Sequence, residues 1–299
     1  MWRGKNRASP RLGPELLQVS GVRSTLAVKD MRKLCLLFGV TIATIGAGAG
    51  PQDDLLRARQ LYNEQLYNLA IDSAAAARRA PQLADTATLI LARSLLERYR
   101  KDADAGDLAT AKTELQQIRP AGLSSIDQVE LVIALGELLY LDDQPGAAAE
   151  EFEMALERVD PKNPGARERV LDWWASAVDR QAQMRSETER ATLYSRIVVR
   201  MEDELRRNTA SAVASYWLVA GARGSGDLDR AWNAALAGWA RASLTGEGRT
   251  RLRADLEQIV MQAIIPERAR LVAPAGNATQ AGAAMRAEWT ALKQAWAEP

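Results

Sequence analysis

The sequence predicts an all-α fold, and three observations support this prediction. Sustained alternation of polar and apolar residues, the pattern of half-buried strands, is missing apart from one apolar run near residue 40. Alanine, leucine, arginine and glutamate, which form helices readily, dominate the 299 residues. Apolar side chains also recur at helical spacing, as at Leu131, Leu135, Leu138 and Leu139, which share one face of a helix.

The first 49 residues differ from the rest of the chain. Residues 1–30 carry no apolar periodicity and are interpreted as an extension that precedes the true start at Met31. A short basic segment, an apolar run over 34–46 and the small residues Ala47-Gly48-Ala49 then follow in the order of a secretory signal peptide. Because this run is shorter than the about 20 residues of a membrane span, we expect a signal at 31–49 that is cleaved before Gly50. The alternative is an uncleaved signal that anchors the protein to the inner membrane.

The stretch 126–161 has the clearest internal pattern. Two amphipathic runs flank a turn at 142–145, and the second run places Ala148, Phe152 and Ala155 on one face. With the pair Leu135-Gly136 ahead of them, these residues resemble the tetratricopeptide repeat. The resemblance implies helix–turn–helix units stacked into a right-handed, TPR-like α-solenoid of about five pairs, here over residues 50–244.

The remaining helix pairs are placed along the chain by the same spacing. The first repeats the small alanines of the central unit, the second contains an insertion, and the fourth has helices longer than the repeat allows. In the fifth, Trp232 and Trp239 lie seven residues apart, and we expect them to share a buried face toward the fourth pair. The predicted helices are 53–80 for the first pair, then 88–99 and 108–118, 167–184 and 188–207, and 214–222 and 231–242.

The end of the chain is expected to close the stack. Residues 245–271 predict capping helices, with Pro266 ending or kinking one of them, and 272–282 predict a flexible linker rich in Ala and Gly. The last helix, 283–299, carries an apolar stripe at Met285, Trp289, Leu292 and Trp296. A stack of repeats exposes an apolar face at its end, so we expect this helix to be a cap. The alternative is a detachable helix that binds a partner.

The composition excludes several kinds of chemistry. The sequence has no histidine and its single cysteine, Cys35, lies within the signal, so a mature chain has no imidazole catalyst, imidazole metal ligand or disulfide. Without residues 1–49, which hold 8 basic and 2 acidic side chains, 31 basic and 36 acidic ones remain, a net charge of −5. This mild acidity argues against nucleic acid as a partner. No phosphate-binding loop is present either, and we expect neither a metal nor a cofactor.

The resemblance also implies a binding surface, because the first helix of each pair lines the concave side of a tetratricopeptide stack. The inward positions, carried over by register, combine both signs of charge with tyrosine hydroxyls, which suits a peptide or an extended polar segment. The alternative is a solvated face whose ion pairs contribute little. These positions are Arg59, Tyr62, Asn63, Arg93, Glu97, Glu130, Glu137, Tyr140, Asp172, Ser176, Asp179, Arg180, Tyr216 and Arg223.

The segment 171–183 holds two adjacent tryptophans and two carboxylates seven residues apart. Trp173 and Trp174 point about 100° apart on a helix, so both cannot occupy one contact, and the register that buries Trp174 turns Asp172 and Asp179 inward. A glycan-acting enzyme can use paired carboxylates with a tryptophan as a platform for the sugar. The alternative is that the carboxylates pair with arginines and the tryptophans fill the core.

The expected function is that of a non-catalytic scaffold, or a module that binds a protein or peptide, in the cell envelope. The protein is expected to be secreted or periplasmic, and to touch a membrane only through its signal segment if that is not cleaved. The alternative function is an envelope enzyme that acts on glycan through Asp172 and Asp179.

Overall fold

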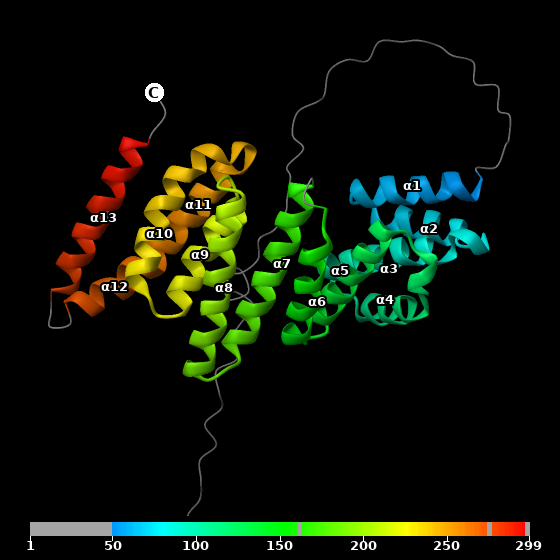
Figure 1. Cartoon of the computed structure of the whole chain (residues 1–299), viewed down its shortest axis with the longest axis horizontal. Coiled ribbons are helices and arrows are strands. Elements are labelled where there is room, and N and C mark those ends of the chain that lie inside the picture. Colours follow the sequence, from blue (N-terminus) through cyan, green and yellow to red (C-terminus); the bar gives the residue numbers. More distant parts are fainter. Residues whose placement is uncertain (1–49, 161–162, 274–276, 297–299) are drawn as a thin grey trace, which may run out of the picture. The chain divides into compact units, whose positions relative to one another are not determined.

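The computed structural model describes residues 50–160, 163–273 and 277–296, so the predicted extension at 1–30 and signal at 31–49 lie outside the described residues. Within these ranges the chain forms helices and turns and no strand, which confirms the all-α prediction (Figure 1). None of the described helices combines the length and apolar character that crossing a membrane requires. The helices are α1 (Pro51–Asn63), α2 (Tyr67–Ala77), α3 (Ala84–Asp102), α4 (Ala105–Gln117), α5 (Ser125–Leu141), α6 (Pro145–Arg158), α7 (Pro164–Gln183), α8 (Glu187–Arg207), α9 (Ala212–Gly224), α10 (Leu228–Arg241), α11 (Arg249–Ile259), α12 (Ile265–Val272) and α13 (Ala278–Ala295).

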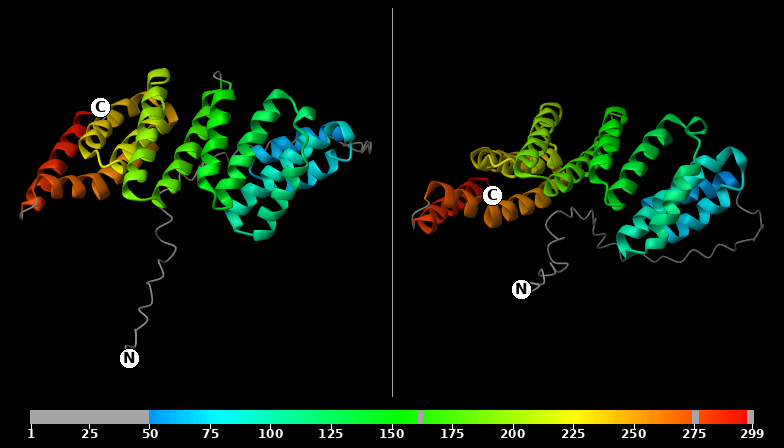
Figure 2. Two further views of the ribbon diagram at one scale, coloured as in Figure 1. Left: turned by 60° about the horizontal axis from the view of Figure 1, so that its bottom comes forward. Right: turned by 90° about the horizontal axis from the view of Figure 1, so that it is seen from below.

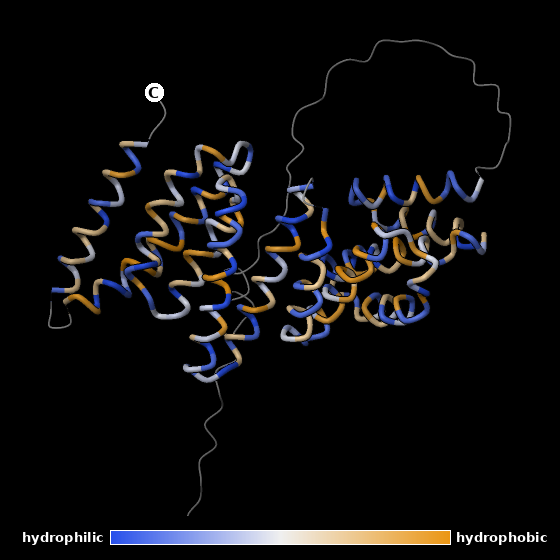
Figure 3. The backbone as a smooth tube through the Cα atoms, viewed as in Figure 1, coloured by the Kyte–Doolittle hydropathy of each residue, from blue (hydrophilic) through white to orange (hydrophobic). Residues whose placement is uncertain are grey.

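Apart from α11 and α12, helices that follow one another in the chain pack side by side in an antiparallel arrangement, as the views of Figure 2 show. The odd-numbered helices have a second kind of neighbour. From α1 to α11, each contacts the next odd-numbered helix directly. Polar and apolar residues are mixed along each helix (Figure 3), and the apolar ones recur every three to four positions so that each helix buries one side against its neighbours. This sequential packing in pairs is consistent with a helical repeat.

Three of the helix pairs share the same turn. The turns between α1 and α2, α5 and α6, and α9 and α10 are each three residues long, and their middle residues Gln65, Asp143 and Gly226 have φ of 62°, 59° and 86°. The left-handed conformation reverses the chain tightly and favours glycine, as at Gly226. The fifth residue after each middle residue is a fully buried alanine. These alanines are Ala70, Ala148 and Ala231.

The centre of the third pair is packed as predicted. Ala148, Phe152 and Ala155 have no exposed surface. Gly136 of α5 faces the Phe152 ring so closely that an added Cβ would lie 2.7 Å from a ring carbon. The glycine is therefore required by the close approach of α5 and α6, since any larger side chain would displace the ring.

The longest described helices are α3 of the second pair and both helices of the fourth pair. α3 extends beyond the predicted 88–99 at both ends, and α7 and α8 span 20 and 21 residues. Trp174 is fully buried, so the register predicted for the fourth pair is confirmed. The adjacent Trp173 is half-buried and its ring stacks on Phe152, with 5.7 Å between ring centroids.

The C-terminal part differs from the sequence prediction in two ways. Trp232 and Trp239 share a buried face as expected, but they contact Trp289 of α13, with centroid distances of 6.2 and 5.2 Å, instead of facing the fourth pair. The predicted linker 272–282 is shorter, because α12 extends to Val272 and α13 begins at Ala278. A Cβ added at Gly282 would lie 3.6 Å from the Cβ of Ala269, so α13 passes close to α12 at this glycine.

Pro266 does not end the helix in which it lies. A π-helical turn over Val260–Ile264 joins α11 to α12 without interruption. Proline has no N–H, and its ring clashes with the carbonyl four residues earlier in a regular helix. The wider turn directly before Pro266 relieves both problems.

Candidate functional site

The predicted site residues lie on α1, α3, α5, α7 and α9, and their contacts connect these helices to one another. Asp127 and Glu130 of α5 bind arginines of α1 and α3, and Trp173 and Asp172 of α7 contact α5 and α9. We give the name odd-helix face to a set that combines most of these residues with four further ones on α3, α7, α9 and α11, namely Arg100, Trp173, Trp217 and Asp255. It consists of Arg59, Tyr62, Arg93, Glu97, Arg100, Glu130, Glu137, Tyr140, Asp172, Trp173, Asp179, Arg180, Tyr216, Trp217, Arg223 and Asp255.

A first polar cluster forms where α1, α3 and α5 meet. The Arg93 guanidinium lies 4.8 Å from the centroid of the Tyr62 ring and pairs with Glu130. Glu97, one turn further along α3, pairs with Arg100 at 3.2 Å. Tyr67, at the start of α2, stands 5.9 Å from Tyr62, centroid to centroid. Three helix pairs thus contribute to one cluster.

Glu137 is the central acid of this cluster. Its side chain is 5% exposed, it forms no ion pair with any described residue, and its Oε2 has no hydrogen-bond partner. Burial raises the pKa of the Glu137 carboxyl to about 7, because the charged form loses its hydration. The attraction of Arg93 opposes this increase and the repulsion of Glu97 adds to it. A buried carboxylate without a donor is costly and calls for an explanation.

Aromatic rings extend the odd-helix face from α5 to α7. Tyr140 contacts the edge of Trp173, with centroids 5.2 Å apart, and Arg180 lies 5.0 Å from the centroid of Tyr140. Arg100 of α3 lies 5.3 Å from the centroid of Trp173. Each of these two rings therefore carries a guanidinium of the protein itself, in the geometry of a cation–π contact.

A second polar cluster lies on α7, α9 and α11. Asp172 accepts a hydrogen bond from the Trp217 indole at 2.7 Å, and burial raises the pKa of this carboxyl to about 6. Asp179 accepts from the Tyr194 hydroxyl at 2.6 Å and from Gln183 at 2.7 Å, and burial raises its pKa as well. Burial raises the pKa of the Tyr216 hydroxyl to about 12, and the negative charges of Asp179 and Asp172 add to this increase.

The arginines of the odd-helix face all have carboxylate partners within the protein. Arg180, for example, binds the Asp143 carboxylate at 2.9 Å and donates to the Tyr140 carbonyl at 3.0 Å. The predicted groove residues Arg93 and Arg223 are engaged in the same way. The five pairs are Arg59–Asp127, Arg93–Glu130, Arg100–Glu97, Arg180–Asp143 and Arg223–Glu267.

Sequence reasoning missed several members of these clusters. Arg100 is seven residues from Arg93, a spacing that places both on one helix face and that was available as a signal. Tyr67 and Asp255 carried no such signal, because α2 and α11 were not assigned to the surface. The negative charge of Asp255 contributes to the raised pKa of both the Asp172 carboxyl and the Tyr216 hydroxyl, so Asp255 lies near the second cluster.

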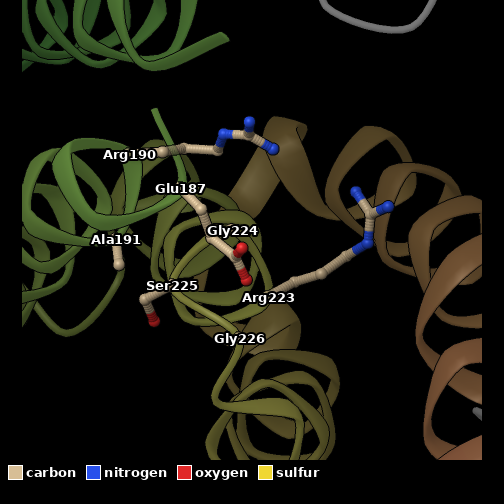
Figure 4. Close-up of a pocket in the computed structure, with 7 residues that line it drawn as sticks. All are labelled: Glu187, Arg190, Ala191, Arg223, Gly224, Ser225 and Gly226. Atoms are coloured by element: carbon tan, nitrogen blue, oxygen red, sulfur yellow. The ribbon is translucent and has the colours of Figure 1, made fainter. Parts of the chain in front are cut away.

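A pocket of about 250 Å³ opens between the start of α8 and the end of α9 (Figure 4). It involves one predicted groove residue, Arg223, whose guanidinium is held by Glu267 in hydrogen bonds of 2.6 to 3.2 Å. The described residues gather no group of three side chains suited to bind a metal ion. The pocket is lined by Glu187, Arg190, Ala191, Arg223, Gly224, Ser225 and Gly226.

Comparison of the chain with protein-family models, with curated proteins and with solved structures finds no match. The chemistry of the odd-helix face therefore has to be interpreted from its own residues.

Proposed function

We propose that the protein is a non-catalytic module that binds a protein or peptide segment along the odd-helix face, in the manner of a tetratricopeptide stack. The observation that carries this proposal is the continuous series of polar and aromatic side chains that links α1 to α11 through direct contacts between odd-numbered helices. Such a series offers regularly placed hydrogen-bond groups and rings to an extended ligand. The signal-like sequence at 31–49 supports a place in the cell envelope.

The alternative enzyme is less well supported by the same residues. A hydrolase needs two carboxylates free to meet one substrate. Here Asp172 is bound to the Trp217 indole, and Asp179 to the hydroxyl of Tyr194 and the amide of Gln183. These hydrogen bonds hold each carboxylate in place, which favours a role in organising a binding surface.

The experiment blocks one face of the protein at a time. With Cys35 replaced by serine the chain has no other cysteine, so a single cysteine can be introduced and coupled to a bulky maleimide. Arg180→Cys places the label on α7 within the odd-helix face, and Glu150→Cys places it on the even-numbered helix α6. Partners are then captured from envelope extract.

We expect the label at position 180 to abolish capture and the label at position 150 to leave it unchanged. The unlabelled cysteine variants control for the substitutions themselves. Equal capture by both labelled proteins would show that the odd-helix face is not where the partner binds.

A further inference from the structure

On the odd-helix face every arginine forms an ion pair within the protein, whereas some of the carboxylates do not. Every arginine on it already has a carboxylate of the protein as its partner. Three of its carboxylates, in contrast, form no ion pair with a described residue. They are Glu137, Asp172 and Asp179. Arg93, Arg251 and Arg223 respectively attract them from a greater distance.

Glu137 is the strongest of these three cases. Its Oε2 is buried and accepts no hydrogen bond, although a buried carboxylate normally accepts several. Nearby, Tyr67 is a ring of the same cluster over which no described guanidinium lies, and its hydroxyl is close to Glu97 and Glu137. An aromatic ring beside two carboxylates is a setting that attracts an ammonium or guanidinium group.

The second cluster has the same imbalance. Asp172 and Asp179 accept hydrogen bonds from neutral donors, an indole, a hydroxyl and an amide. Asp255 of α11 is paired more distantly, with Arg251 at 3.8 Å. A cation that reaches this cluster meets negative charge from α7 and α11 together.

We infer that the segment bound by the odd-helix face is basic, with a lysine or arginine side chain that donates to Glu137 and a second that reaches Asp172 and Asp179. This inference rests on the proposed function and adds the charge of the partner to it. The protein's own arginines over Tyr62, Tyr140 and Trp173 illustrate how a basic side chain lies on this surface.

An acidic segment does not fit the same surface. To bind arginine it would have to replace an existing carboxylate, such as Glu130 on Arg93 or Glu267 on Arg223. It would also lie beside carboxylates that form no ion pair, and juxtaposed like charges oppose binding. The net charge of −5 over residues 50–299 also opposes the binding of an acidic segment.

The test measures binding of defined peptides to the full chain by fluorescence anisotropy, at a pH above the pKa of about 7 of the Glu137 carboxyl so that this group is charged. The probe is a labelled peptide of alternating lysine and alanine, and two matched peptides carry glutamate or glutamine in place of lysine. The variants are Glu137→Gln and Asp172→Asn, which keep the side-chain size and remove one charge each. Glu150→Gln removes one charge from the even-numbered helix α6, where the side chain is 69% exposed, and serves as the control.

We expect the lysine peptide alone to bind, and its affinity to fall by about tenfold or more in Glu137→Gln, the loss of a charge-assisted hydrogen bond. Asp172→Asn should also weaken binding, and Glu150→Gln should not. If all three variants weaken peptide binding equally, the effect comes from the net charge of the protein and not from Glu137 or Asp172, and the inference is overturned.

Failure of this inference can be told apart from failure of the proposed function. If the glutamate peptide binds instead and labelling at position 180 blocks it, the odd-helix face is a binding surface but for acidic segments. If lysine-peptide binding is unaffected by labelling at position 180 and by Glu137→Gln, this inference falls, and the proposed function falls only if capture from envelope extract is also unaffected by the label at position 180.

Discussion

The contact between Gly136 and Phe152 allows a test of the packing in the third pair. The same substitution at Gly136 should destabilise the wild-type protein and stabilise a variant that lacks the Phe152 ring. An alanine Cβ at position 136 would lie 2.7, 2.9 and 3.0 Å from three atoms of the Phe152 ring. The ring is fully buried and stacked on Trp173, so it has little room to move. Overpacking of this kind costs about 1–3 kcal/mol, whereas replacing glycine by alanine inside a helix stabilises it by about 1 kcal/mol. Gly136→Ala should therefore destabilise the wild-type protein by up to about 2 kcal/mol.

Removing the ring reverses this effect. Phe152→Ala should cost about 3–5 kcal/mol, because the transfer free energy of the ring is lost and a cavity is left. In that background the added methyl group meets empty space, and Gly136→Ala should stabilise by about 1 kcal/mol. The free energies of unfolding are measured by urea denaturation followed by circular dichroism, and the four proteins form a double-mutant cycle.

The cycle should give a coupling free energy of about 1–3 kcal/mol, equal to the overpacking cost. If Gly136→Ala changes the stability by the same amount with and without the ring, the two residues are not in contact. A cost below about 1 kcal/mol for Phe152→Ala would show that the ring is not in the core.

Three further predictions concern other parts of the chain. Glu137 should make stability depend on pH, because burial raises the pKa of its carboxyl from 4.5 to about 7 in the folded state; the groups that face it are Tyr62, Tyr67, Arg93, Glu97, Arg100 and Glu130. Between these two pH values the folded state holds a proton that the unfolded state has released. The free energy of unfolding should therefore fall by up to about 3 kcal/mol as pH rises from about 4.5 to about 7. Glu137→Gln should remove this part of the pH dependence of urea denaturation, and a profile identical to wild type would contradict the assignment. Trp289→Ala should cost about 3–5 kcal/mol, because it removes a fully buried ring that contacts Trp232 and Trp239 and donates to Glu257 at 2.6 Å. Trp296→Ala at the C-cap of the same helix, where the residue is 44% exposed, should change stability by less than about 0.5 kcal/mol, and similar losses in both would refute the capping role of α13. Terminal sequencing of protein from the envelope fraction should find Gly50 first, whereas material that begins wholly at Met1 or Met31 would rule out a cleaved signal.

The helices and much of the core were predictable from the sequence because they depend on local spacing. The alanines after each turn, Phe152 and Trp174 follow the helical period, and each is buried where that period places it. The pairing of tryptophans at the end of the chain was not predictable. It depends on how α13 folds back, which brings Trp289 against Trp239, fifty residues earlier in the sequence.

The candidate site was predictable as a set of residues but not in its charge balance. Register placed Arg93, Glu137 and Asp172 on the same series of helices, as the structure has them. Which carboxylate each arginine binds is decided by side-chain reach between helices, as in Arg93 with Glu130 and Arg223 with Glu267. These pairs leave Glu137 without a partner, and no spacing within one helix reveals that.

The most direct measurement of the central claim joins the bound peptide covalently to the carboxylates that it touches. A carbodiimide activates a carboxylate and lets a lysine amine within reach form an amide, and mass spectrometry then identifies the residue joined to the lysine–alanine peptide. The account predicts adducts at Glu137, Asp172 or Asp179, which disappear from position 137 in Glu137→Gln. Adducts confined to carboxylates of the even-numbered helices, such as Glu150 and Glu153 of α6, would contradict it.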